Sequence, residues 1–81
     1  MKLSEALSGG GIITGAVNRD SGEPVEAFRE SDSPIPRTRY RLIIHQTALP
    51  DINLLYDDVD ELVADLKQRR PDLPEDRWER T

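Results

Sequence analysis

The side chains best suited to chemistry are three arginines that alternate along one segment of the chain. Arg37, Arg39 and Arg41 are two residues apart, and in a β-strand this spacing places all three on one face. A row of guanidinium groups donates hydrogen bonds to carboxylates, to phosphates or to a nucleic-acid backbone. The arginines are therefore a candidate partner-binding surface, and the alternative is a charged sheet face that only meets solvent.

Four acidic side chains form a second candidate surface, because their spacing suits one face of a helix. Like charges at these spacings repel one another and contribute little to the helix itself. A face that retains this repulsion suits a basic partner, such as a protein surface that normally binds nucleic acid. Helix capping and solubility are the alternative explanation. The four residues are Asp57, Asp58, Glu61 and Asp65, and Asp65 also has Arg69 four residues on.

The one tryptophan, Trp78, is the third candidate, and it lies in a polar C-terminal segment. A segment of that polarity would not fold for its own sake. The indole can fold back onto the core, which is thin in so short a chain, or stay exposed as an anchor for a partner, since tryptophan is enriched at interface hot spots. We expect the folded-back position and keep the exposed anchor as the alternative.

No arrangement typical of an enzyme or a metal site is present in the sequence. The chain has no cysteine and one histidine, His45, whereas metal sites usually combine several such ligands. The run Gly9-Gly10-Gly11 continues into neither phosphate-binding glycine motif. A calcium loop starting at Asp58 lacks the glycine and the later ligands that such a loop needs. We therefore predict no catalytic, cofactor-binding or metal-binding residues and no enzymatic activity.

Composition and net charge argue against two classes of partner, nucleic acid bound non-specifically and membranes. The chain has 81 residues and a net charge of −5, which argues against a non-specific nucleic-acid binder. Residues 57–81 carry five basic and nine acidic side chains, a net charge of −4. No stretch approaches the roughly 20 apolar residues of a membrane span, and the first residues lack the apolar core of a secretory signal. We expect a cytoplasmic protein that does not bind membranes.

Four segments have the character of strands. Residues 12–17 and 25–28 suit a hairpin with a long loop, and the serine- and proline-rich residues 31–36 should end it. Residues 37–47 are the strongest strand candidate, because they are rich in residues that favour a pleated surface. Residues 52–56 fit a returning strand, although their apolar spacing also suits a helix that continues into the next segment.

Residues 58–70 are expected to form an amphipathic helix. Asp58 is a suitable N-cap with Glu61 three residues on. The spacing of Val59, Leu62, Val63 and Leu66 forms one apolar face, and a proline follows at position 71.

The predicted fold class is α+β, a small antiparallel sheet of three to four strands packed against one C-terminal amphipathic helix. Residues 12–70 form the domain, residues 1–11 a flexible N-terminal arm, and residues 71–81 a tail or short helical turn. For the first ten residues, the alternative is a short helix that orders on contact, because Leu3 and Leu7 are four residues apart. The core is expected from strand 37–47 and the helix, with Ile12, Val17, Phe28, Ile52 and Leu54 as lesser members.

The function expected from these features is that of a small acidic protein-binding module without enzymatic activity: a regulator, an inhibitor or an assembly subunit. Small proteins of this shape often serve phages or mobile elements. The alternative is a nucleic-acid-binding module that uses the arginine-lined sheet face. Another protein is the favoured partner, nucleic acid is the less favoured one, and association with identical chains is left open.

Overall fold

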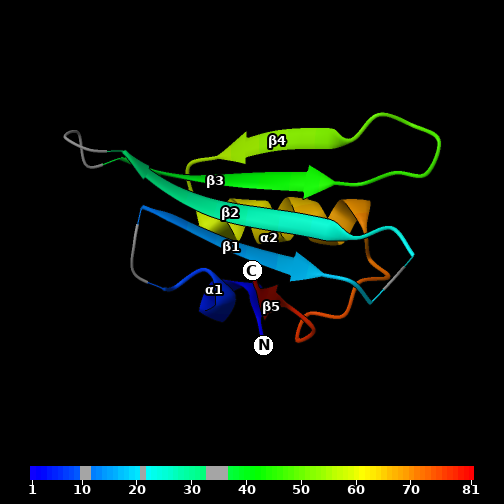
Figure 1. Ribbon diagram of the computed structural model, residues 1–81, viewed down its shortest axis with the longest axis horizontal. Helices are drawn as coiled ribbons and strands as arrows, with labels where there is room; N and C mark the ends of the chain where they lie inside the picture. The colour runs from blue at the N-terminus through cyan, green and yellow to red at the C-terminus, as the bar shows by residue number, and fades with distance from the viewer. Residues whose placement is uncertain (10–11, 21, 33–36) are drawn as a thin grey trace.

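The protein consists of one antiparallel sheet with two helices, as the computed structural model shows for residues 1–9, 12–20, 22–32 and 37–81. The side chains of residues 32 and 37 lie outside this description. The α+β class is confirmed, with five described strands in the order β4-β3-β2-β1-β5 (Figure 1). The elements in chain order are α1 (Leu3–Ala6), β1 (Ile13–Asn18), β2 (Val25–Asp32), β3 (Arg37–Ile44), β4 (Ile52–Tyr56), α2 (Val59–Arg69) and β5 (Glu79–Arg80).

One face of the sheet forms one side of the hydrophobic core, because apolar residues of four neighbouring strands lie opposite one another. Leu42 of β3 lies opposite Ala27 of β2 on one side and Leu54 of β4 on the other. Ala27 in turn lies opposite Ala16 of β1. Leu42 and both alanines are fully buried. The small alanines leave room for the side chains that cover this inner face.

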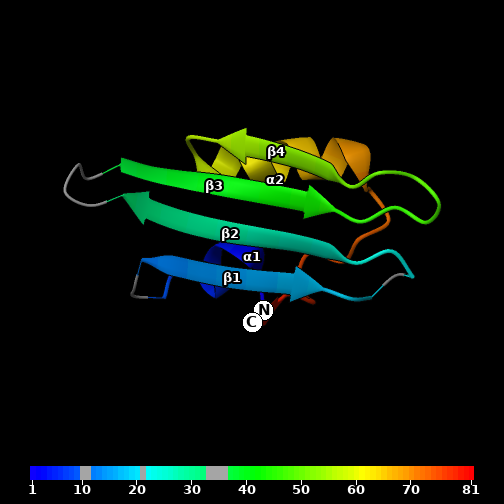
Figure 2. The same ribbon diagram turned by 45° about the horizontal axis from the view of Figure 1, so that its top comes forward.

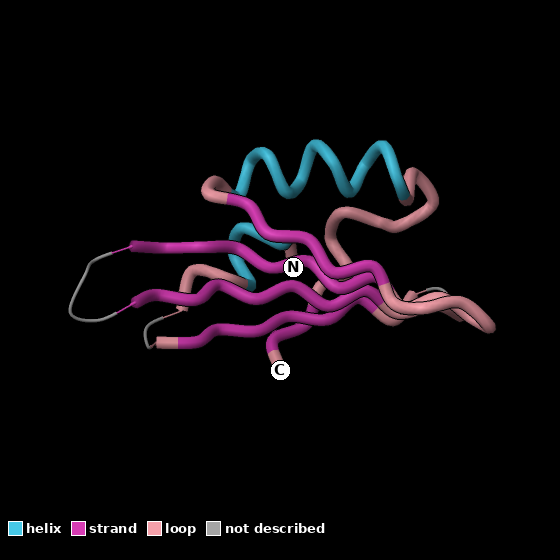
Figure 3. Tube along the Cα trace, turned by 90° about the horizontal axis from the view of Figure 1, so that it is seen from above, coloured by secondary structure: helices cyan, strands magenta, loops and turns pink. Residues whose placement is uncertain are grey.

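Both helices cover this same inner face. Helix α2 packs on β3 and β4, and α1 packs on β1. Figure 2 shows the two helices behind the sheet, and Figure 3 shows them on one side of it. The opposite face therefore has no helix over it in the part of the chain that is described. Among the described residues, no helix has the length and apolar character needed to cross a membrane.

Helix α2 forms as its sequence predicts. The carboxylate of Asp58 accepts a hydrogen bond of 3.0 Å from the backbone N–H of Asp60, which satisfies one of the free amides at the helix start. Leu62 and Leu66 of the apolar face are buried. Residues 52–56 form strand β4, so the alternative of one continuous helix through this segment is wrong.

The N-terminal segment packs against the domain, although its sequence predicts an arm outside it. Leu3, Ala6 and Leu7 are buried in the main core cluster. The short helix α1 places these three side chains on one side, since residues three and four apart share a helix face. The domain therefore includes residues from both sides of the boundary expected at residue 12.

The C-terminal segment returns to the N-terminus, which is the folded-back position expected for Trp78. Its side chain is 3% exposed and belongs to the main core cluster. Its backbone N–H donates to the carbonyl of Met1 at 3.0 Å. The next residues form β5, which pairs with β1. The segment expected as a tail or helical turn therefore supplies a fifth strand and a large core side chain.

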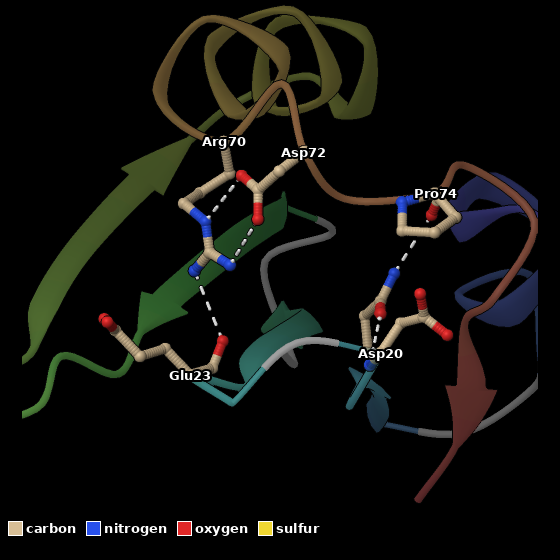
Figure 4. A network of polar contacts seen from close by, with 6 residues as sticks. Asp20, Glu23, Arg70, Asp72 and Pro74 are labelled. Carbon is tan, nitrogen blue, oxygen red and sulfur yellow. Dashed lines mark hydrogen bonds and ion pairs between the residues drawn. The ribbon is translucent and has the colours of Figure 1, made fainter.

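The turn after α2 is held by an arginine. The Arg70 guanidinium donates two hydrogen bonds of 3.0 Å to the carboxylate of Asp72 and one of 3.2 Å to the carbonyl of Glu23 (Figure 4). The buried side chain of Asn18 donates to the carbonyl of Pro74 at 3.0 Å. These contacts tie the C-terminal segment to the loop between β1 and β2.

Several predictions from the sequence are wrong, and in β2 the reason is that strand pairing overrides local composition. Strand β2 continues through Ser31, which lies opposite Thr38 of β3, although this position was expected to break the strand. Strand β3 ends at Ile44, so His45 follows the strand, although the sequence predicts a strand through residue 47. Ile12, expected in the core, is exposed.

Substitution of Leu3 tests whether the N-terminal segment belongs to the folded unit. Leu3→Ala removes a buried side chain and should lower the free energy of unfolding by about 2–4 kcal/mol. The matched control is Leu49→Ala, because Leu49 is 63% exposed and its loss should change stability by less than about 0.5 kcal/mol. Urea unfolding followed by Trp78 fluorescence measures both. Equal stability of the two variants would show that α1 is not part of the cooperative core.

The loop between β3 and β4 contains a residue in a costly backbone conformation. Ala48 has a φ of 62°, a region that disfavours side chains with a Cβ atom. Ala48→Gly should therefore raise the free energy of unfolding by about 0.5–1 kcal/mol. Ala64→Gly, the same change in the exposed middle of α2, should lower it by about 1 kcal/mol. Thermal melts that shift in the same direction for both variants would contradict this explanation.

Candidate protein interface

The sheet face opposite the helices has no helix over it among the described residues (Figure 3), and we call it the open face. Residues that alternate with the buried ones point to it. Its apolar members include Ile13 and Leu55, which are 68% and 52% exposed, and the half-buried Phe28 and Ile43. Exposed apolar side chains on one face are typical of interaction surfaces when they lie together.

At the centre of the open face, the aromatic ring of Phe28 in β2 lies close to the backbone of Gly15 in β1. Phe28 lies directly opposite Gly15 in the strand register. A Cβ atom on Gly15 would lie only 2.9 Å from the Phe28 ring, and closer still to the hydroxyl of Thr81. The absence of a side chain at Gly15 therefore lets the ring lie over β1.

Arg39 and Arg41 lie on the open face, but they do not form a row of free donors. Arg41 donates to the Glu30 carboxylate at 3.0 Å and to the Asn53 side-chain oxygen at 2.9 Å. Arg39 lies on the same face through the alternation of β3, and its Nε is buried without a hydrogen-bond partner among the described residues. The side chain of Arg37 lies outside the described part of the chain. The described arginine surface is thus partly neutralised by its own neighbours.

The outermost strand β4 forms one edge of the sheet, which we call the β4 edge. Its residues are Ile52, Asn53, Leu54, Leu55 and Tyr56, with no charge, proline or glycine among them. Natural proteins usually protect an edge with lysine, proline or a bulge, because its free N–H and C=O groups can pair with another strand. No described strand lies beyond β4, so this edge has no such protection within the strand.

Acidic side chains stand at both ends of the β4 edge. Asp51 precedes the strand, and Asp57 and Asp58 follow it; all three are exposed. Glu61 is exposed on the first turn of α2, so three of the four acids predicted as a surface lie close together in the chain after β4. Asp58 also serves as the helix cap described above.

Asp65, the fourth predicted acid, is used inside the domain. Its carboxylate accepts hydrogen bonds from the Tyr56 hydroxyl and, at 3.2 Å, from Nε of Arg69. The bond from Tyr56, together with that from Arg69, holds the pKa of Asp65 below its usual value. Burial, reinforced by the bond to Asp65, raises the pKa of Tyr56 to about 12. Asp65 therefore joins α2 to β4 and is not part of the exposed acidic surface.

The side chains of His45 and Trp78 make contacts inside the domain. The His45 ring lies between the carboxylates of Glu26, at 3.3 Å, and Asp51, at 3.0 Å, and thereby links the β3–β4 loop to β2. Among the described residues, no group of three or more histidines and acids is placed to hold a metal ion. Trp78 is buried on the helix side of the sheet, away from the arginines.

No local sequence pattern indicates the hydrogen-bond partners of Arg41 and Asp65. Glu30 and Asn53 reach Arg41 only because β2 and β4 flank β3, and Tyr56 reaches Asp65 only because α2 folds back over β4. These contacts follow from the strand order and not from the local sequence.

Comparison with known proteins found no family model, no curated protein and no solved structure that matches this chain.

The burial of Tyr56 and its bond to Asp65 predict a loss of stability at alkaline pH. The pKa of Tyr56 is about 12 in the folded protein, against an ordinary value of 10.0. The contribution is therefore fully present below pH 10 and is lost as the pH rises toward 12, because the unfolded chain ionises first. Tyr56→Phe should remove this part of the pH dependence and cost about 1 kcal/mol at neutral pH.

Tyr40→Phe is the matched control, because Tyr40 also packs against the core and the substitution keeps the bond between Tyr56 and Asp65. Free energies of unfolding at pH 8 and at about pH 11 measure the effect. A Tyr56→Phe variant that loses as much stability as Tyr40→Phe over this interval would disprove the assignment.

Proposed function

We propose that this chain is a small protein-binding module that pairs its β4 edge with an extended strand of a partner protein. The observation that carries the proposal is the composition of this edge. Five uncharged residues stand at the border of the sheet, and acidic side chains stand at both ends of them. The partner strand is then apolar or neutral in its middle and basic at its ends.

Strand addition suits this edge for a physical reason. The backbone of β4 on the side away from β3 can form a further ladder of hydrogen bonds, which supplies affinity with little dependence on sequence. An added strand would also extend the open face, and its outward side chains would meet Asn53 and Leu55. Specificity then comes from alternate side chains and from the charges at the two ends.

The acids favour a basic partner over a second copy of this chain. In an antiparallel pair of two β4 strands centred on Leu54, Asp51 of each copy would lie opposite Asp57 of the other. Like charges directly opposite each other destabilise a strand pair. A strand with lysine or arginine at its ends would instead meet opposite charges at both positions.

The arginine face supports a nucleic-acid partner less well. Arg41 already bonds to Glu30 and Asn53, and Glu26 lies on the same face. The net charge of −5 also opposes association with a polyanion.

A synthetic strand tests the proposal directly. The probe is a short peptide that alternates valine and threonine and carries lysines at both ends, titrated into labelled protein and followed by NMR. We expect saturable shifts of the backbone amides that centre on residues 52–56, and slower hydrogen exchange there. The same peptide with glutamates at its ends should bind at least about tenfold more weakly, which corresponds to ~1.4 kcal/mol.

Matched variants separate edge pairing from general attraction. Asp51→Asn and Asp76→Asn remove the same charge from exposed sites, but only the first should weaken binding of the lysine peptide. Leu55→Lys should weaken it more than Leu49→Lys. Equal binding of the lysine and glutamate peptides, or shifts that avoid β4, would refute the proposal. Salt-dependent binding of duplex DNA that Arg39→Gln and Arg41→Gln abolish would replace it with the nucleic-acid alternative.

A further inference from the structure

A second surface lies on the helix side of the sheet, away from the β4 edge. A half-open cavity of about 110 Å³ lies between α1, α2 and residues 73–78. Leu3, Leu66 and Trp78 are among the residues that line it, and all three are largely buried members of the core. The apolar wall of the cavity is therefore held in place by the fold itself.

The size of the cavity limits what can enter it. An apolar cavity of about 150 Å³ can hold a benzene molecule. A slightly smaller cavity that opens to solvent suits the terminal carbons of an alkyl chain, with the rest of the chain and its polar end in the mouth. Apolar walls with a few polar groups at the entrance are the usual composition of a small-molecule site.

The mouth of the cavity is cationic, although the protein as a whole is acidic. Lys2 and Lys67 both line it. The Lys67 ammonium lies 2.6 Å from a carboxylate oxygen of Glu75, and this pair is exposed, with about 60% of each side chain accessible. An exposed ion pair contributes little to stability, so a carboxylate from outside can replace Glu75 at small cost.

The mouth of the cavity stabilises an ionised carboxylate, as the side chain of Glu75 shows. The hydrogen bond and the charge of Lys67, with a smaller contribution from Lys2, keep the pKa of Glu75 below its usual value. Both ammonium groups thus stabilise one negative charge at the mouth. The side chain of Glu75 occupies the position that the head group of a ligand would take.

We propose that this cavity binds a small alkyl carboxylate, with its chain against Leu3, Leu66 and Trp78 and its head group on Lys67 and Lys2 in place of Glu75. The site is separate from the β4 edge and does not depend on the function proposed there. The ligand class follows from the pairing of an apolar wall with a cationic mouth.

Trp78 is the one tryptophan of the chain and lines the cavity, so its fluorescence reports occupancy. The probe is octanoate, titrated below its micelle concentration, with octanol and octylammonium as ligands of the same chain length. We expect a saturable change in emission with octanoate at a concentration at least about tenfold lower than with octylammonium. Octanol should fall between them.

Substitution of the two members of the ion pair should have opposite effects. Glu75→Gln removes the internal competitor and should tighten octanoate binding about twofold to fivefold. Lys67→Gln removes the cation and should weaken it about fivefold to tenfold. A purely structural ion pair would instead respond to both substitutions in the same direction. Circular dichroism of the two variants checks that the fold is retained.

Three results would overturn the proposal. The first is the absence of a saturable response to octanoate, and the second is an equal response to octanoate and octylammonium. The third is a response to an acetylated peptide that ends in leucine without any response to octanoate. Binding of the lysine peptide at β4 is measured separately, so the failure of either proposal leaves the other testable.

Discussion

The width of the sheet is the constraint on which the rest of this structure depends. Five strands span about 19 Å at the usual spacing, whereas a helix that runs along them covers about 10 Å. Helix α2 covers β3 and β4, and the inner face over β1 and β2 has to be covered by something else. The two ends of the chain do this: α1 packs on β1, and Trp78 lies beside both helices. The cavity with the cationic mouth lies where these three pieces meet.

The elements that could be predicted from the sequence are those with local signals. Asp58 and the apolar spacing of α2 are sufficient to place that helix, and alternation is sufficient to place Arg39 and Arg41 on one side of β3. Helix α1 has four residues, too few for a helix to be stable by itself, and it exists because Leu3 and Leu7 are buried. Strand β5 has two residues and depends in the same way on β1. The spacing of Leu3 and Leu7 is compatible with a helical turn, but tertiary contacts decide whether such short elements form.

The candidate interface, too, could be predicted from the sequence only in part. Residue type and spacing indicate which side chains share a face, but the partners of those side chains come from neighbouring strands. Arg41 forms an ion pair with Glu30 and donates a hydrogen bond to Asn53, and Asp65 is turned toward Tyr56. The sequence of β4 does not show that this strand lies at an edge, because a strand at the centre of a sheet can also lack charged residues. The strand order is what places β4 at the border. The surface that remains for a partner is therefore defined by topology more than by motif.

The pairing of Met1 with Trp78 has a consequence for the way the chain folds. The ammonium of Met1 donates to the carbonyls of Asp76 and Trp78, and the amide of Trp78 returns a bond to the carbonyl of Met1. These contacts join residues 75 to 77 positions apart, so the loop that must close is nearly the whole chain. Loop entropy opposes this step until the sheet has brought the ends together. The hairpins of β1 to β4 can form early from nearby residues, whereas we expect the layer of the core around Trp78 to form last and to open first. Fraying or proteolysis that begins at either end would therefore release the other end as well.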